Sequence, residues 1–197
     1  MNYFVGGRGT MIDVACKCGL TSISSAFRPW DPDTVNIGEF NRIYLIIREP
    51  NSRLLSAWRM YFEGPSIKWL EQGVHADYIR EPRFIQEHAE RILADPIRYF
   101  RRFVRQQLVN YQTDPHFAPQ WREYRRFYLN HPRRVFLWNH KYLNNLFKQC
   151  GVPPVQKHVQ KWQWPELKRE QFYQQIPASV LDTYYMEDQI LWQAVDK

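Results

Sequence analysis

The chain has 197 residues and a mass of 24.0 kDa, which suits one domain with a core of its own. Its 44% hydrophobic and 24% charged residues are ordinary for a soluble globular protein. The net charge of +7 favours an anionic partner such as a nucleotide, an acidic glycan, a nucleic acid or a membrane surface. Because no run of about 18 apolar residues and no signal peptide is found, we expect no stable membrane insertion and a cytoplasmic location.

The chain contains three cysteines, and their spacing predicts neither a disulfide nor a zinc site. Cys16 and Cys18 lie two residues apart where a strand gives way to a turn, which is a poor spacing for a mutual disulfide. A reducing compartment is the simpler expectation.

In the first half of the chain, two apolar runs predict strands, each followed by a helix. The first pair is a strand over 12–15 and a helix over 21–27, followed by a loop over 28–38. The second pair is a strand over 42–47 and a helix over 52–63, which Gly64 and Pro65 end. The continuous apolar run at 42–47 is typical of a central parallel strand that is buried on both faces. Residues 66–82 carry no clear pattern.

The second half reads mainly as helices. We expect helices over 83–93, 96–109, 141–150 and 166–175, a last helix from 176 onward, a loop over 112–120 and a strand over 134–138. Asp95 is the expected N-cap of the second of these helices, and Gly151 ends the helix over 141–150. The alternation of strands and helices predicts a single α/β domain over 1–197, with a central parallel sheet flanked by helices and a helix-rich C-terminal half.

Two segments have the chemistry of anion-binding loops. After the first strand, Lys17 supplies a charge, Gly19 allows close approach of the backbone, and Thr21 and Ser22 supply hydroxyl groups at a helix start. After the strand over 42–47, Arg48 stands at the strand's end, and its alternative role is an ion pair with Glu49 or a helix partner. Parallel strands collect ligands at their carboxyl ends, so we expect both segments to face one crevice and one ligand with two phosphates.

The first loop differs from the nucleotide loop of common kinases. The pattern G-x-x-x-x-G-K-[ST] is absent, and Lys17 precedes Gly19 instead of following a glycine. This difference disfavours ATP chemistry, although a kinase-like phosphoryl transferase stays an alternative hypothesis.

These two segments resemble the sulfotransferases that use 3′-phosphoadenosine 5′-phosphosulfate (PAPS), especially the Golgi carbohydrate sulfotransferases and their microbial relatives. Residues 16–22 are similar to the family's Pro-Lys-x-Gly-x-Thr-Ser loop, and residues 47–58 are similar to its V-R-D-P-x-x-R-L-x-S-A-Y motif. Residues 114–120 are similar to its H-[WF]-x-P-Q segment, and residues 181–192 to its closing Y-x-x-D helix. Cys16 and Glu49 depart from the family's Pro and Asp, and residues 157–160 match an H-x-N segment only loosely.

The resemblance implies a P-loop-like sulfotransferase fold, PAPS as the cofactor, 3′-phosphoadenosine 5′-phosphate (PAP) as its product, and no metal. Lys17 would stabilise charge on the departing bridging oxygen, and Arg48 and Ser56 would bind the 3′-phosphate. The residues expected to bind the cofactor are Lys17, Cys18, Gly19, Leu20, Thr21, Ser22, Arg48 and Ser56. The chain is short for the family, so the acceptor site is less defined than the cofactor site.

His116 is the first candidate for the general base that deprotonates the acceptor, because it lies on a loop and an imidazole exchanges protons near neutral pH. Its alternative role is a structural hydrogen bond. Glu39, Asp31 and Asp33 are the other candidates for the base, whereas His140 is expected to cap a helix start.

The acceptor is expected to be a carbohydrate, and a nucleic acid is not expected as a partner. Arginines cluster in two places, which indicates either solvated helix faces or a rim that attracts an acidic substrate: Arg98, Arg101, Arg102 and Arg105, then Arg122, Arg125, Arg126, Arg133 and Arg134. A non-catalytic protein that binds anions or glycans is therefore a third hypothesis. The oligomeric state is not readable from the sequence.

Overall fold

The computed structural model describes residues 3–6, 9–15, 18, 20–30, 36–62, 91–155 and 164–196. The chain divides into two compact units. The first unit comprises Met1–Glu49, Pro119–Gln160 and Glu187–Lys197, and the second comprises Pro50–Ala118 and Lys161–Met186. Each unit has its own cluster of buried apolar side chains. The single domain over 1–197 stays a prediction, because compact units can belong to one domain.

The first unit contains a five-stranded mixed sheet with the strand order β3-β1-β2-β4-β5. Its strands are β1 (Tyr3–Gly6), β2 (Thr10–Asp13), β3 (Arg28–Trp30), β4 (Arg42–Ile47) and β5 (Val135–Asn139). Strands β2, β4 and β5 are parallel, as predicted, whereas β1 runs antiparallel to both β2 and β3. The predicted central parallel sheet is thus present in β2, β4 and β5, and the sheet as a whole is mixed. Only three residues join β1 to β2, and so short a connection allows only a hairpin.

The three predicted strands are present, and two others were not expected. Strand β4 has the predicted bounds, and its residues Ile43–Ile47 are all buried. Strand β2 begins and ends two residues earlier than predicted, and β5 lies one residue later. Strand β3 lies within the expected loop over 28–38 and carries Pro29. It is an edge strand of the sheet, where a proline is tolerated because one side of the strand needs no hydrogen bonds.

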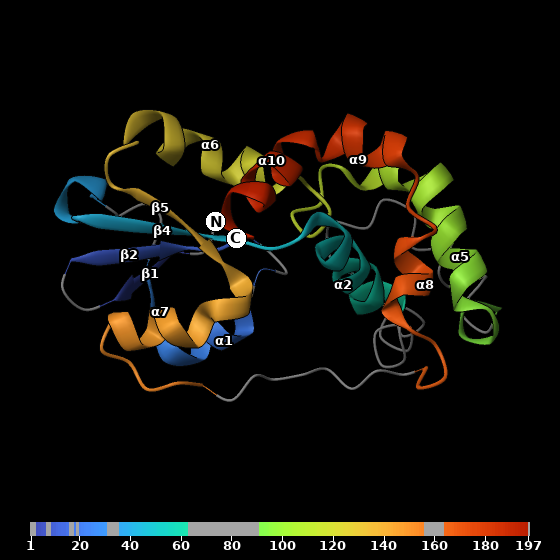
Figure 1. The fold of residues 1–197 in the computed structure, drawn as a ribbon, viewed down its shortest axis with the longest axis horizontal. Helices are drawn as coiled ribbons and strands as arrows, with labels where there is room; N and C mark the ends of the chain where they lie inside the picture. The colour runs from blue at the N-terminus through green and yellow to red at the C-terminus, as the bar shows by residue number, and fades with distance from the viewer. Residues whose placement is uncertain are drawn as a thin grey trace. The chain divides into compact units, whose positions relative to one another are not determined.

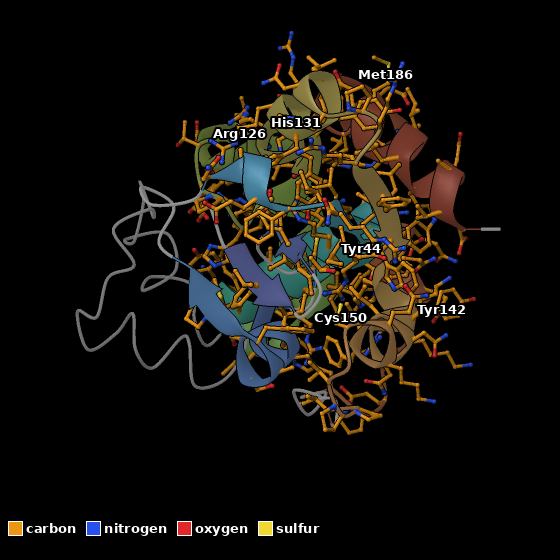
Figure 2. All side chains as sticks on the ribbon, turned by 90° about the vertical axis from the view of Figure 1, so that its left-hand side faces the viewer. Tyr44, Arg126, His131, Tyr142, Cys150 and Met186 are labelled. Atoms are coloured by element: carbon orange, nitrogen blue, oxygen red, sulfur yellow. The ribbon has the colours of Figure 1, made fainter. Side chains whose placement is uncertain are left out.

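Helices cover both faces of this sheet (Figure 1). On one face lie α1 (Leu20–Ala26) and α7 (Leu143–Gln149), and on the other lie α6 (Gln120–Asn130) and α10 (Met186–Val195). A 3-10 turn over His140–Tyr142 leads into α7, which ends at the buried Cys150 and at Gly151 with its φ of 75°. Figure 2 shows Tyr142 and Cys150 flanking α7 and Tyr44 on the sheet, where the Tyr44 hydroxyl donates to Gln149 at 3.3 Å.

The second unit is helical where the structure describes it. Its helices are α2 (Pro50–Phe62), α5 (Pro96–Arg102), α8 (Arg169–Tyr173) and α9 (Ala178–Tyr184), and residues 91–94 are helical too. The fully buried Trp58 on α2 stacks on Phe62 and meets the edge of Phe100, with ring centroids 5.4 and 5.2 Å apart. The helix-rich C-terminal half is confirmed, and the chain is an α/β protein.

Several predicted helix bounds need correction. The helix predicted over 96–109 ends as an α-helix at Arg102 and continues as a π turn over Phe103–Gln107 and a 3-10 turn over Leu108–Tyr111. Its N-cap is confirmed, because the Asp95 side chain accepts from the backbone of Arg98. The helix predicted over 166–175 is shorter, and the predicted last helix is two helices, α9 and α10. Residues 83–90 lie outside the described residues.

Helix α6 was not predicted, although Trp121, Tyr124 and Phe127 recur along it at helical spacing. Among the helices that the structure describes, none has the length and apolarity that a membrane crossing requires.

Candidate functional site

The two predicted anion-binding loops start at neighbouring positions of one sheet edge. Strands β2 and β4 are adjacent and parallel, with Asp13 opposite Leu45, so the loops that follow them leave the same carboxyl edge. The two strands that precede the loops are therefore parallel neighbours, as predicted, and a crevice that both loops face stays a prediction.

Gln120 connects these two loops through its side-chain amide. Its Oε1 accepts hydrogen bonds from Cys18 Sγ and from the backbone N–H of Arg48, each at 2.9 Å. Its Nε2 donates to the Arg48 carbonyl oxygen at 2.8 Å. The Gln120 side chain is fully buried, so water cannot replace these bonds. The amide thus pairs with Arg48 as a neighbouring β-strand would.

Asp188 on α10 positions Gln120 at the start of α6. One carboxylate oxygen of Asp188 accepts from the Gln120 backbone N–H and the other accepts from the Trp121 backbone N–H, both at 2.8 Å. Pro119 precedes the helix and supplies no side-chain cap of its own. A carboxylate distant in sequence therefore caps α6 and complements the positive end of its dipole.

Tyr124, one turn further along α6, joins the ends of the two strands. Its hydroxyl accepts from the backbone N–H of Ala15 at 2.7 Å and donates to the carbonyl oxygen of Ile46 at 2.8 Å. Burial, followed by the nearby Cys18 and Asp13, raises the pKa of the Tyr124 hydroxyl well above its usual value. The phenol is therefore neutral, which it must be to donate to Ile46.

Asp13 ends β2 and is fully buried. In the part of the chain that the structure describes, neither of its carboxylate oxygens has a hydrogen-bond partner. Burial raises the pKa of Asp13 well above its usual value, and the negative charge of Glu123 raises it further. The nearby backbone of Val14 opposes this shift but does not outweigh it. The carboxyl group therefore favours its protonated, neutral form.

The structure describes only part of the predicted cofactor site. Lys17 and Gly19 lie outside the described residues, and so do the side chains of Leu20 and Thr21, the residues that begin α1. Ser22 is half-buried in the first turn of α1, and Arg48 is half-buried directly after β4. Ser56 is half-buried on α2, which belongs to the second unit.

In the second unit, His116 lies beside a buried carboxylate. The Nδ1 atom of His116 is 2.8 Å from Oδ1 of Asp114, and the backbone N–H of His116 donates to the same oxygen at 2.8 Å. The Tyr61 hydroxyl donates to the other Asp114 oxygen at 2.8 Å and lies 3.0 Å from His116 Nδ1. The Asp114 side chain is fully buried, whereas that of His116 is 20% exposed.

These contacts select one tautomer of the neutral His116 ring. The single proton of the Tyr61 hydroxyl goes to Asp114, so both atoms near Nδ1 are acceptors. Nδ1 therefore carries the ring proton, and Nε2 is the basic nitrogen. A histidine whose Nδ1 is held by a buried carboxylate is the arrangement that general-base catalysis uses in many hydrolases and transferases.

Two buried side chains donate hydrogen bonds to the backbone of the loop that carries His116. The guanidinium of Arg53, on α2 and almost fully buried, donates to the carbonyl oxygen of Pro115 at 3.1 Å. The Tyr185 hydroxyl donates to the carbonyl oxygen of Phe117 at 2.6 Å. Because buried groups bind its backbone, the loop presents His116 in one position.

The other predicted candidates for the base are less suited where they are described. Glu39 is exposed in a 3-10 turn over Ile37–Glu39 that follows β3. Asp31 and Asp33 lie outside the described residues. His140 does not cap the turn that it begins, because the side chain of Asn139 accepts from the Lys141 backbone N–H instead.

Sequence reasoning missed the residues that organise both sites. Gln120 and Asp114 lie within the 114–120 segment quoted above, yet only His116 was assigned a role. The sequence signal for Gln120 is its place directly after Pro119 in that segment, whereas its burial is seen only in the structure. Tyr61 offered no signal, because its spacing on α2 fits an ordinary core position.

Comparisons of this chain with protein-family models, with curated proteins and with solved structures find no match.

Proposed function

We propose that the chain transfers a sulfuryl group from PAPS to a hydroxyl group of an acceptor, or less readily to an amine, by in-line displacement. One observation carries the proposal: the two loops with anion-binding chemistry leave adjacent parallel strands at one sheet edge, and Gln120 bonds to both. A bisphosphorylated nucleotide needs two such anion-binding points, one for each end.

The charge at this edge fits an anionic ligand. The Arg48 guanidinium brings a positive charge to the end of β4. Burial raises the pKa of Asp13, the carboxyl group at the end of β2, and this shift reduces the negative charge that Asp13 would bring near a phosphate. In the proposal, Lys17, Gly19 and the first turn of α1 bind the 5′-phosphosulfate, and Arg48 and Ser56 bind the 3′-phosphate.

The proposed step needs a base and stabilisation of the leaving group, but little covalent chemistry from the protein. The acceptor oxygen forms a bond to sulfur while the bond between sulfur and the bridging oxygen breaks. The acceptor's proton passes to Nε2 of His116, and the ring, now positive, is stabilised by Asp114. The electron pair of the broken bond stays on the 5′-phosphate of PAP, where Lys17 stabilises the charge.

Nucleotide binding and turnover test this proposal separately. We expect PAP to raise the melting temperature of the full chain more than ATP with Mg²⁺ does. Lys17→Ala and Arg48→Ala should remove the PAP effect and the transfer of radiolabelled sulfate from PAPS. Arg42→Ala is the matched control, because Arg42 is exposed at the opposite end of the same strand.

Each other outcome would support a different hypothesis. Stabilisation by ATP with Mg²⁺ alone would favour a kinase-like phosphoryl transferase. Stabilisation by a sulfated glycan without any response to PAP would favour a non-catalytic glycan-binding protein. A Lys17→Ala variant with normal sulfate transfer would falsify the proposed reaction.

A further inference from the structure

A pocket lined by arginines lies on the helical segment that follows Asp95. It has a volume of about 340 Å³ and is wholly in the second unit. Its lining combines four cationic side chains with one aromatic ring and one amide: Arg98, Arg101, Arg102, Arg105, Tyr99 and Gln106.

These arginines lie on one side of the segment. Arg98, Arg101 and Arg102 belong to α5 and Arg105 to the π turn that continues it, and all four line the same pocket. Phe100, Phe103 and Val104 occupy the opposite side and are buried in the core of the unit. The four arginines are exposed, so the core holds the helix while the cationic face meets solvent.

The segment itself does not neutralise this charge. Residues 96–107 contain no aspartate or glutamate, and Asp95 accepts from the backbone of Arg98 as the N-cap. Within the described ranges, no carboxylate forms an ion pair with Arg98, Arg101 or Arg105. Like charges three and four residues apart destabilise a helix. A bound anion would therefore reduce the repulsion among the arginines of the pocket.

We propose that this pocket binds the sulfate or carboxylate groups of an acidic oligosaccharide. Guanidinium groups pair with such anions through two parallel hydrogen bonds. Tyr99 offers a flat ring for a sugar ring to lie against, and Gln106 offers an amide for its hydroxyl groups. The volume is within the range of small-ligand pockets and suits one or two sugar rings.

A saccharide fits this lining better than a single-stranded nucleic acid does. Proteins that bind single strands stack successive bases on several aromatic side chains, whereas this pocket contains one. The proposal that the pocket binds a sugar depends only on the pocket itself. That the bound sugar is the sulfate acceptor rests on the proposed function.

Calorimetric titrations of the full chain test the site. The probes are a sulfated tetrasaccharide, a neutral tetrasaccharide of the same length and an oligothymidylate of matched charge. The variant Arg101→Gln/Arg105→Gln removes two charges from the pocket. The control Arg125→Gln/Arg133→Gln removes two from exposed positions in the first unit. Arg101→Lys/Arg105→Lys keeps the charge but removes the bidentate hydrogen bonding of the guanidinium groups.

We expect the sulfated tetrasaccharide to bind the wild type more tightly than either other probe. The pocket variant should weaken this binding about tenfold for each lost arginine, and the lysine variant by a smaller factor. The control should change it less than about threefold. Equal losses in the pocket and control variants, tighter binding of the oligothymidylate, or equal binding of the neutral sugar would each overturn the proposal.

Titration of the same variants with PAP separates this proposal from the proposed reaction. Because the pocket arginines have no role in the cofactor site as proposed, PAP should bind the pocket variant as it binds the wild type. If the pocket variant loses affinity for the sugar but neither the wild type nor the variant binds PAP, the result supports the glycan site and contradicts the sulfotransferase proposal.

Discussion

The side chain of Gln120 pairs with the main chain of Arg48 at both of its polar groups, accepting from the N–H at 2.9 Å and donating to the carbonyl oxygen at 2.8 Å. A side-chain amide can make both bonds at once, because its oxygen accepts and its NH2 group donates. The backbone that carries the proposed 3′-phosphate ligand is therefore held by a residue 72 positions away in sequence.

Gln120→Glu should weaken the fold by roughly 2–4 kcal/mol at neutral pH, measured by urea unfolding. The new carboxylate cannot donate to the Arg48 carbonyl, and it lies next to the Asp188 carboxylate, which Gln120 Nε2 approaches at 3.4 Å. Gln149→Glu is the control, since Gln149 is exposed and accepts a bond from Tyr44, which a carboxylate also accepts. Equal effects of the two substitutions would contradict the pairing.

Asp114→Asn should lower kcat for sulfate transfer by about 10²–10⁴-fold while the affinity for PAP is kept. The amide removes the negative charge that orients the Nδ1 proton of His116 and stabilises the protonated ring. Asp95→Asn is the matched control in the same unit, because asparagine caps a helix as well as aspartate does. His116→Ala should likewise lower kcat while the affinity for PAP is kept. Loss of PAP affinity in either variant would instead make Asp114 and His116 part of the cofactor site.

Asp13→Asn should leave the stability at pH 7.5 unchanged or raise it. The pKa of Asp13 is raised in the folded state, so the folded state keeps a proton that the unfolded state loses above about pH 4. The wild type should therefore lose stability as the pH rises from about 4 through the folded pKa, and the variant should lose less over this window.

Urea unfolding of both proteins at pH 4.5, 6.0 and 7.5 measures this difference. If the variant were instead less stable than the wild type, with a deficit that grows with pH, Asp13 would be ionised in the folded state. That result would mean that a cation partners it.

Asp188→Ala should destabilise the chain by about 2–4 kcal/mol, because the buried backbone N–H groups of Gln120 and Trp121 lose their acceptors. Asp182→Ala, at an exposed position of α9, should change the stability by less than about 0.5 kcal/mol. Thermal unfolding of the two variants side by side checks the prediction. A loss at Asp188 no larger than at Asp182 would show that α6 does not depend on this cap.

The sequence alone determined those elements whose local pattern is strong. The apolar run at 42–47 became the buried strand β4 with the predicted bounds, since a strand buried on both faces needs apolar residues at every position. Asp95 became an N-cap and Gly151 adopted a positive φ, because capping and left-handed turns depend on the residue itself. The parallel direction of the two strands that precede the loops also followed, because strands that alternate with helices form a parallel sheet.

The tertiary structure decided what depends on partners far away in the chain. Strand β3 exists because β1 pairs with it, although Pro29 locally favours a loop. Helix α6 is held by a carboxylate from α10 and by the bonds of Tyr124 to the strand ends, and neither partner can be read from the sequence of the helix. The hydrogen bonds of Gln120 with Arg48, and of Asp114 with His116 and Tyr61, could not be predicted either. The position of a polar residue in the sequence does not indicate which group it will bond to. Buried hydrogen bonds are made wherever folding brings a donor to an acceptor, and only the folded chain shows where that is.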